Sequence, residues 1–274
     1  MRRLTGIQFK NEIVLFLRNS FGSLFTLDFA KVIVPILILW ETIPLMGIIP
    51  QGLLPRLSTV AVSFYTLLTQ HGLLGHIGIS LLRFFIGFVI AVALAIPIGI
   101  LMGWSRFIRR HLLPLFQLLA PIPPPAWVPI TIIALGIGLK MQGFLVFIGV
   151  FYPVLLNTYT GTRDTNRRFI NTARLFGASE LTILREVVLP SALSNILMGM
   201  KIGTSMGLVC VVISEMFGAS SGLGWLLVES KNFYRIDRMM VTMLLLGGIG
   251  WFIIEVFKYI ELKLSLWKIG EVTG

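Results

Sequence analysis

The sequence has little charge, one cysteine and few histidines, and each shortage excludes a class of protein. Asp, Glu, Lys and Arg make up 13% of the 274 residues, about half the share in ordinary soluble domains. The single cysteine, Cys210, lies in an apolar run, which excludes a disulfide and a thiolate metal site. The histidines (His71, His76 and His111) lack metal-ligand spacing, and we expect them at a surface or interface. No glycine-rich loop ends in Lys-Ser or Lys-Thr, so the sequence predicts no nucleotide site in this chain.

Apolar residues are abundant instead. They make up 56% of the chain, and the mean hydropathy is +0.90. Runs of about 20 apolar residues predict transmembrane helices. Six such runs are found, at Val32–Ile49, Ile79–Trp104, Leu112–Gly138, Gly143–Thr160, Ala192–Phe217 and Met239–Leu262. The sequence therefore predicts an all-α, polytopic membrane protein with one membrane domain over residues 31–267.

The basic residues explain the net charge of +11 as a topology pattern. If the N-terminus is cytoplasmic, sixteen of the 23 Lys and Arg residues fall on cytoplasmic segments and five on external ones. This asymmetry follows the positive-inside rule, predicts two cytoplasmic termini and leaves no need for a nucleic-acid partner. Residues 1–30 predict an amphipathic segment at the cytoplasmic interface with no cleavable signal, and residues 268–274 a short cytoplasmic tail.

The third predicted span is interrupted by five prolines between Pro121 and Pro129. Prolines lack the N–H donor and prevent a regular helix. Broken backbone at membrane depth is stable only where protein buries it or where it lines a watery cavity. Pro123 and Pro124 are therefore candidates for the translocation path, with a kink that only packs as an equally weighted alternative. Between the first two spans, residues 49–72 predict a short external helix.

Ionisable residues inside predicted spans are further candidates for the path. For Arg83, near the external end of its span, snorkelling to the interface is favoured over anion contact. Lys201 is expected either to face an inward cavity or to reach lipid phosphate. Glu215 would repel an anion, so a structural or gating role beside a basic residue is favoured, and Glu41 is expected to face another helix. Core packing is the commoner role of large apolar side chains. The ones that could instead line a cavity or gate are Met198, Met200, Met206, Met216, Phe217 and Trp225.

One polar stretch, residues 163–190, falls on the predicted cytoplasmic side. Apolar residues recur with helical spacing on both sides of Gly177, which predicts a helix, a turn and a second helix. Pro190 is then placed at the first turn of the fifth span, where a proline costs nothing. An ordinary basic loop is the alternative, but it would not need this periodicity. Small residues at the turn would let a partner approach the backbone.

The spacing of this stretch resembles the EAA loop of permease subunits from binding-protein-dependent ABC importers. In that loop Glu-Ala-Ala is followed by three residues, Gly, nine residues, Ile, one residue and Leu-Pro. The positions that match outright are Ala173, Gly177, Leu189 and Pro190. Val187 is a mild change from Ile, whereas Asn171 and Thr172 depart from Glu-Ala. The segments LLPRLSTV, SLLRFFIGF, PIPPPAWVPITIIALGIG, FYPVLLNTYTG and SEMFGASSGLGWLLVESKNF resemble permeases of the sulfonate, taurine and nitrate/bicarbonate group, and LSLWKIGE resembles a taurine-type ending.

This resemblance implies the type I ABC importer permease fold and a non-catalytic subunit of the cell inner membrane. Two permease copies would enclose the path, and an external binding protein would deliver a small anion, sulfonate or taurine first and nitrate or bicarbonate next. Cytoplasmic ATPase subunits would bind ATP and Mg²⁺, so this chain would hold no cofactor. The residues expected to couple the permease to the ATPase are Asn171, Thr172, Ala173, Arg174, Gly177, Ala178, Ser179, Leu189 and Pro190.

Two other classes of protein stay open at this point. An ion-coupled carrier or a channel would explain the broken third span but would leave the EAA-like loop without a role. An intramembrane hydrolase is a remote alternative, because no span places a His or Asp to activate Ser220 or Ser221.

Overall fold

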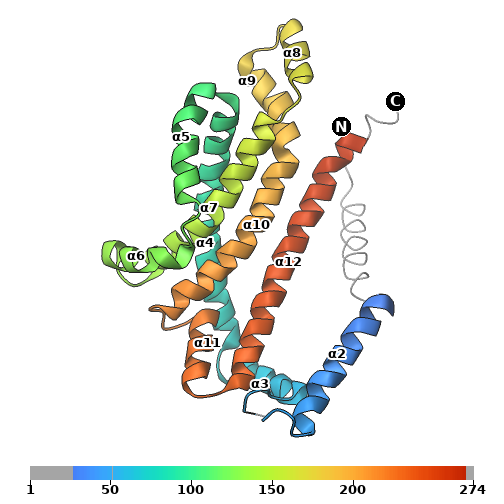
Figure 1. The fold of residues 1–274 in the computed structure, drawn as a ribbon, viewed down its shortest axis with the longest axis vertical. Coiled ribbons are helices and arrows are strands. Elements are labelled where there is room, and N and C mark those ends of the chain that lie inside the picture. The colour runs from blue at the N-terminus through green and yellow to red at the C-terminus, as the bar shows by residue number, and fades with distance from the viewer. Residues whose placement is uncertain (1–26, 51, 270–274) are drawn as a thin grey trace. The chain divides into compact units, whose positions relative to one another are not determined.

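The structure, a computed structural model, describes residues 27–50 and 52–269, and the side chains of residues 31–261 apart from residue 51. Every regular element in these ranges is helical, which confirms the all-α prediction (Figure 1). The chain forms two compact units: one contains the residues up to His71 and Ser230–Val241, and the other contains Gly72–Glu229 and the residues from Thr242 onward. The interfacial segment predicted at residues 1–30 lies outside the described residues except for the start of the first helix, and the tail is described only to residue 269.

The first unit holds α2 and α3, with bounds Leu27–Leu45 and Leu57–Gln70. The second of these is the helix predicted between the first two spans. The Glu41 carboxylate of α2 accepts hydrogen bonds from Ser58 at the start of α3, from the backbone N at 3.0 Å and from the hydroxyl at 2.8 Å. A carboxylate at a helix N-terminus satisfies donors that have no partner within the helix. Glu41 therefore fixes the beginning of the next helix.

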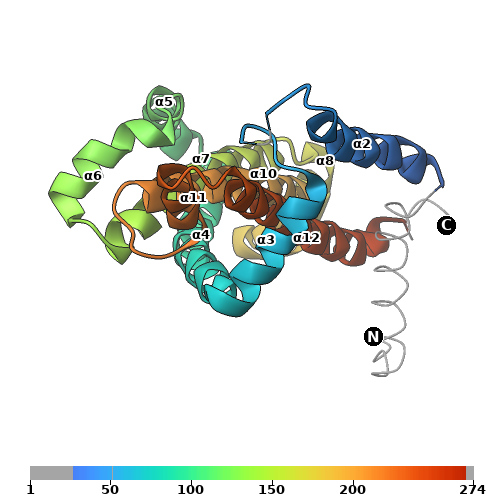
Figure 2. The ribbon, with the colours of Figure 1, turned by 90° about the horizontal axis from the view of Figure 1, so that it is seen from below.

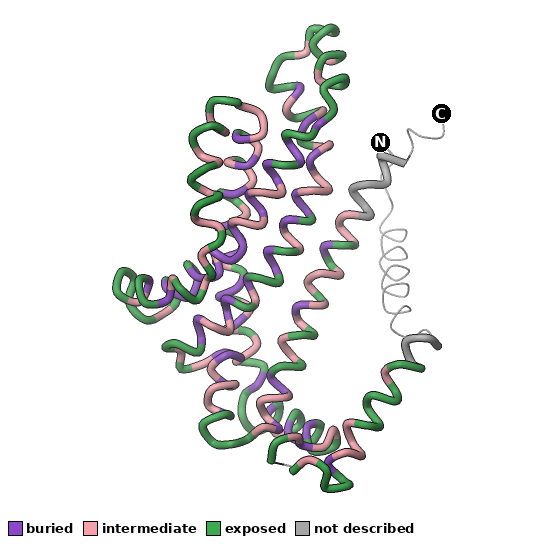
Figure 3. Tube along the Cα trace, viewed as in Figure 1, coloured by how far each residue is buried: buried purple, intermediate pink, exposed green. Residues whose placement is uncertain are grey.

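The core of the second unit is formed by three long helices: α4 (Leu73–Trp104), α7 (Leu139–Arg163) and α10 (Leu189–Met216). The middle one is α7. Of its most apolar membrane-length stretch 61% is buried, against 33% for α4 and 44% for the helix that contains α10. In Figure 3 the buried residues accordingly follow α7 and the parts of α4 and α10 beside it.

Glycines bring these three helices close together. A Cβ added to Gly99 of α4 would lie 2.7 Å from the Cβ of Thr158 in α7. One added to Gly149 of α7 would lie 2.5 Å from the Sγ of Cys210 in α10. Helices in lipid commonly associate through such small-residue contacts, because the hydrophobic effect does not drive helices together there and close packing does.

Each of the six predicted spans coincides with helix in the described residues, but only four or five of them have the length and hydropathy of a membrane span. Among the described residues, four helices are long and apolar enough to cross a membrane: α4, α7, the continuous helix Glu180–Met216 and α12 (Ile236–Ile269). A bent helix pair makes a fifth if it is counted as one span, whereas α2, which covers the first predicted span and carries three charged residues within 19, is not among the helices that qualify. The prediction of a polytopic helical membrane protein is confirmed.

The bent pair is the proline-rich third span. Its first half, α5 (Arg106–Leu119), packs against α4, and a 3₁₀ turn at Pro124–Trp127 leads into α6 (Val128–Leu135). The two halves meet at 90°. In Figures 1 and 2 α6 points away from the bundle of α4, α7 and α10. The predicted interruption of this helix is therefore present, and it is a sharp corner rather than a mild kink.

Candidate functional site

Residues 167–183, here called the hairpin, form the helix–turn–helix predicted around Gly177. The first helix, α8 (Arg167–Leu175), ends in a Schellman motif: Ala178 N donates to Ala173 O at 3.0 Å, and Gly177 N donates to Arg174 O at 2.9 Å. This motif needs a left-handed residue, and Gly177 supplies it with φ +76°. The turn is thus fixed by backbone geometry.

The second helix, α9 (Glu180–Ile183), is capped by Ser179, whose Oγ accepts a hydrogen bond from Thr182 N at 3.2 Å. Across the turn, the Arg174 guanidinium forms a two-pronged ion pair with Glu180, at 2.9 Å from Nε and 3.1 Å from Nη2. The hydrogen bonds to Glu180 raise the pKa of Arg174. Sequence reasoning missed Glu180, although it and Arg174 stand three residues either side of the glycine.

The turn of the hairpin exposes two large apolar side chains. Leu175 and Phe176 are each 87% exposed, at the end of α8. Asn171 and Thr172 are exposed beside them, while Ala173 and Ala178 are half-buried. Exposed large apolar residues at a structured turn are typical of a surface that a partner covers. In Figure 1 the hairpin lies at one end of α7 and α10, beyond the bundle.

The hairpin is joined to α10 without a break. A π-helical turn, Leu184–Val188, follows α9, and Leu189 N donates to Leu184 O five residues earlier. In an α-helix, Pro190 would lack the N–H that bonds to the carbonyl of Glu186, and its ring would clash with that carbonyl. A π-turn is one way in which a continuous helix accommodates such a proline.

Pro190 lies in the first turn of α10, as predicted, but helix already precedes it and continues over Glu180–Met216. Seven of the nine predicted coupling residues lie within the hairpin, and Leu189 and Pro190 stand past the π-turn. Ile183 and Val188, both fully buried, anchor the connection.

Arg83 and Glu215 form a buried ion pair between α4 and the end of α10. The Arg83 Nη1 donates to Glu215 Oε1 at 2.7 Å, and the two residues are 7% and 1% exposed. The same carboxylate accepts hydrogen bonds from Ser80 Oγ and Gly224 N, each at 2.7 Å. The favoured interpretation of Arg83 as a snorkelling side chain is wrong, because it is paired inside the protein. Glu215 pairs with a basic residue, as expected.

This ion pair also holds the loop between α10 and α11 (Leu223–Asn232). Arg83 Nη1 donates to Ser221 O at 2.7 Å, and Ser80 Oγ accepts from Leu223 N at 2.8 Å. Gly222, at φ +114°, has no room for a side chain, since a Cβ would lie 2.3 Å from the Glu215 carboxylate. Glycine here allows the loop backbone to approach the buried acid.

Trp225 packs against a residue that is bonded to the loop that follows α10, whereas Met216 and Phe217 are exposed. Trp225 stacks on His76 with ring centroids 5.2 Å apart, and His76 Nδ1 accepts a hydrogen bond from Gly222 N at 3.0 Å. His76 was expected at a surface or interface and is half-buried against this loop. Met216 and Phe217, at the end of α10, are exposed.

Lys201 of α10 pairs with Glu261 of α12. The side chains are 18% and 33% exposed, so the pair is only partly shielded. Sequence reasoning considered a cavity or a lipid phosphate for Lys201 and did not identify Glu261. The candidates for the path are thus divided: Arg83 and Glu215 form one site, Lys201 belongs to a second, and Pro124 lines a third.

That third place is a cavity of about 310 Å³ at the corner between α5 and α6. Pro124 lines it from the corner, Tyr152 and Asn157 from α7, and Ile202 and Met206 from α10. Pro123, one residue earlier, is exposed. Of the two interpretations of the proline cluster, lining a cavity is the one that this arrangement supports.

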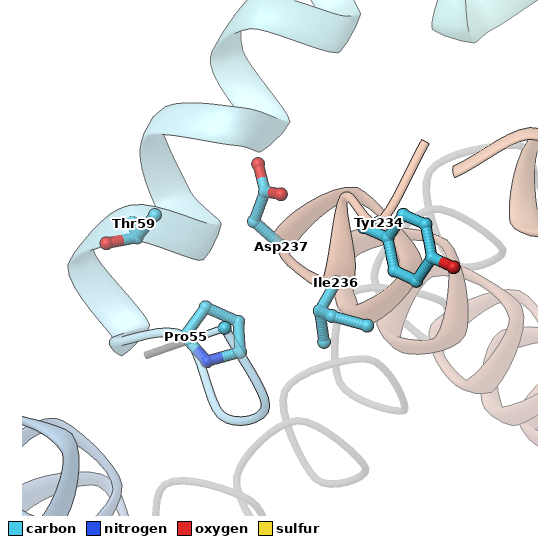
Figure 4. Close-up of a pocket in the computed structure, with 6 residues that line it drawn as sticks. Pro55, Thr59, Tyr234, Ile236 and Asp237 are labelled. Atoms are coloured by element: carbon cyan, nitrogen blue, oxygen red, sulfur yellow. The ribbon is translucent and has the colours of Figure 1, made fainter. Parts of the chain in front are cut away.

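Another cavity, of about 280 Å³, lies in the first unit between the start of α3 and the start of α12. Figure 4 shows Pro55 and Thr59 on one side and Ile236 and Tyr234 on the other. Asp237 also lines it, and its carboxylate accepts hydrogen bonds from the Ser63 hydroxyl and from Arg235 Nη2 at 2.9 Å. Its charge is therefore already compensated. No group of three His, Cys, Asp or Glu residues in the described ranges could hold a metal ion.

A family comparison identifies the kind of protein that carries these features. The model of the binding-protein-dependent transport system inner membrane component matches residues 95–261. The chain belongs to this family. The match includes the hairpin, the π-turn, the cavity at the proline corner and both partners of the Lys201 pair.

Similar proteins are permeases with several stated substrates. An ABC transporter permease protein of Methanocaldococcus jannaschii is 35% identical over 84% of this chain and 88% of its own length. The taurine transport system permease protein TauC of Escherichia coli is 29% identical, covering 86% and 88%. The nitrate import permease protein NrtB of Synechocystis sp. is 30% identical, covering 70% of each.

The fold is also that of a solved importer. An inward-facing structure of the MetNI methionine ABC transporter has a chain that superimposes with a TM-score of 0.57, covering 68% of this chain and 92% of that one at 21% identity. At this identity the likeness concerns the fold alone. It confirms the predicted type I importer permease fold.

As a member of this family, the chain is a non-catalytic permease subunit and a multi-pass membrane protein, and ATP hydrolysis belongs to a separate subunit. The predicted resemblance to permeases of the sulfonate, taurine and nitrate group is confirmed. The hydrolase alternative is excluded by this membership.

Proposed function

We propose that the chain forms the translocation path of an ATP-driven importer for a small anion that an external binding protein delivers. Two copies of the chain would enclose the path, and ATP and Mg²⁺ would bind to the ATPase subunits. The observation that carries the proposal is the hairpin: a rigid, glycine-fixed turn with two exposed apolar side chains, joined to α10 by continuous helix. Because continuous helix joins the hairpin to α10, movement of a bound ATPase would move α10 directly, with no flexible loop between them.

The coupling surface is assigned to the hairpin and the start of α10. Asn171, Thr172, Arg174, Gly177 and Ser179 would meet the ATPase, with Ala173 and Ala178 allowing close approach. Leu189 and Pro190 would transmit the movement through the π-turn. Since the acidic residue of the EAA pattern is replaced by Asn171, apolar contact through Leu175 and Phe176 is proposed as the main grip.

The orientation follows from the distribution of basic residues. The hairpin and both termini would be cytoplasmic, and α3 would be external. For the substrate, sulfonates and taurine are preferred and nitrate or bicarbonate follows. The relatives named for taurine and for nitrate, at 29% and 30% identity, support this class of anions.

The test is transport by the complete complex in proteoliposomes. The permease is reconstituted with its ATPase and binding protein, and uptake of labelled taurine, alkylsulfonates, nitrate and bicarbonate is measured with and without ATP. We expect uptake that needs both ATP and the binding protein. Uptake by the permease alone, driven by an ion gradient, would instead establish a secondary carrier, and stimulation only by a non-anionic solute would refute the substrate class.

A further inference from the structure

We infer that the beginning of α5 binds the phosphate of an anionic phospholipid, with an acyl chain of that lipid along the exposed apolar face of the same helix. The site starts where the span of α4 ends, at Trp104. Ser105 then caps α5, and its Oγ accepts a hydrogen bond from Ile108 N at 3.4 Å. The first turns of α5 carry a cluster of three arginines, which are Arg106, Arg109 and Arg110.

These arginines have no acidic partner in the described part of the chain, where the ion pairs involve other residues. Arg106 and Arg110 are exposed, and Arg109 is half-buried. The surrounding sequence offers no counter-charge, because no Asp or Glu occurs between Glu41 and Asp164. Like charges three and four residues apart on a helix repel each other. An anion from outside the chain would remove this repulsion.

Large apolar side chains continue from the arginines along an exposed face of α5. Phe107 and Leu118 are each 74% exposed, and Leu115 is 48% exposed. The His111 ring lies between Phe107 and Leu115 in this row, with its centroid 4.5 Å from that of Phe107. These four residues are spaced by three or four positions, so they share one side of the helix and form the apolar stripe. The other side of α5 packs on the core, and Figure 3 shows the outer side as exposed.

The apolar stripe has the length of one membrane leaflet. From Phe107 to Leu118 the helix rises by roughly 16 Å, and half of a bilayer's hydrocarbon core is about 15 Å thick. Since α5 is the first half of the bent span, this face lies at membrane depth. Guanidinium groups bind phosphate oxygens through paired hydrogen bonds. The phosphate and the acyl chain of one phospholipid therefore find matching surfaces in the right order along a single helix.

The apolar stripe favours a lipid over the other anions that could meet the arginines. A soluble phosphate, or an acidic surface of the ATPase, would contact the arginines and leave the stripe without a partner inside the membrane. A lipid with a net negative headgroup is favoured over a zwitterionic one, by about fivefold in affinity for each arginine near the headgroups. The positive-inside rule explains the orientation of such a segment and predicts no preference between lipids afterwards. The ligand is therefore assigned as an anionic glycerophospholipid, and phosphatidylglycerol is the probe.

The experiment measures which lipid lies beside α5. Gln117→Cys, at an exposed polar position next to the apolar stripe, is introduced in a Cys210→Ser background and labelled with bimane. The permease–ATPase complex is placed in phosphatidylcholine nanodiscs that contain increasing mole fractions of either phosphatidylglycerol or phosphatidylcholine with brominated chains. Bromine quenches the fluorescence of the probe on contact. Ile133→Cys on α6, at a position that is 86% exposed, is the matched reporter away from the arginines.

We expect half-maximal quenching at position 117 at a mole fraction of phosphatidylglycerol about tenfold below that of phosphatidylcholine. At position 133 the two lipids should quench equally. Arg106→Gln/Arg110→Gln should bring the two mole fractions at position 117 within about twofold of each other. The charge control is Arg167→Gln/Arg168→Gln, which removes two exposed arginines from α8 and should leave the lipid preference unchanged.

Equal quenching by the two lipids with the native arginines would overturn the inference. An equal loss of preference in both double variants would also refute it, because net charge alone would then be the cause. If soluble glycerol phosphate restores the fluorescence, the ligand is a phosphate without an acyl chain and the lipid is refuted. A preference found in the permease alone and lost when the ATPase is bound would assign the arginines to the ATPase interface instead. No transport enters this measurement, so it stands or fails independently of the proposed function.

Discussion

Replacing Arg83 by Met should destabilise the permease far more than removing the whole ion pair. In Arg83→Met, the buried Glu215 keeps Ser80 Oγ and Gly224 N as donors but loses its only cationic partner among the described residues. Breaking a buried pair in this way costs about 3–5 kcal/mol, because one charge stays buried without compensation. With about 2–4 °C per kcal/mol for a chain of this size, the melting temperature should fall by roughly 6–20 °C.

The double variant Arg83→Met/Glu215→Gln is the decisive control. The carboxamide oxygen introduced at position 215 can still accept from Ser80 and Gly224, and no charge remains, so most of the lost stability should return. Cys210 makes the assay simple: it is the single cysteine of the chain and is 1% exposed, so a fluorogenic maleimide reacts with it only on unfolding. A double variant that melts no higher than Arg83→Met would show that the uncompensated charge is not the cause of the loss.

Three further outcomes are expected. Gly177→Val forces a β-branched residue into φ +76° and should abolish the stimulation of ATP hydrolysis by substrate, whereas Gly177→Asn tolerates that conformation and should retain it. Equal stimulation in both variants would show that the left-handed turn is not needed for coupling. Arg174→Glu should weaken co-purification of the ATPase, and adding Glu180→Arg should restore it; no recovery in the double variant would show that the pair does not shape the hairpin. Gly99→Ala, whose Cβ would lie 2.7 Å from Thr158, should cost about 1–3 kcal/mol in the Cys210 unfolding assay, and an unchanged midpoint would show that α4 and α7 do not pack this closely.

Local patterns predicted the helices and the hairpin well. Apolar runs and proline positions indicate spans and their interruption, and a glycine between two periodic segments indicates a turn. The rule that a proline is favoured at a helix start placed Pro190 correctly in the first turn of α10, but the sequence does not reveal that the preceding helix continues into it. Only the structure shows the π-turn that absorbs the fault.

Contacts between distant residues were not predictable in this way. Arg83 and Glu215 are 132 positions apart, and nothing local distinguishes a paired arginine from one that reaches the interface. Glu261 and Lys201 present the same difficulty. Tyr152 and Asn157 were overlooked because a tyrosine and an asparagine in an apolar run are unremarkable until the prolines beside them open a cavity.

The π-turn at Leu184–Val188 fixes an angle as well as a join. It contains one residue more than an α-helical path would use, and each residue of an α-helix turns the chain by about 100°. The face that the hairpin presents is therefore rotated, relative to α10, by the equivalent of one surplus residue. Deleting one residue of the π-turn would keep every side chain of the hairpin and turn them to face another direction relative to α10. The direction in which the proposed ATPase-binding surface faces therefore depends on this one extra residue of the π-turn.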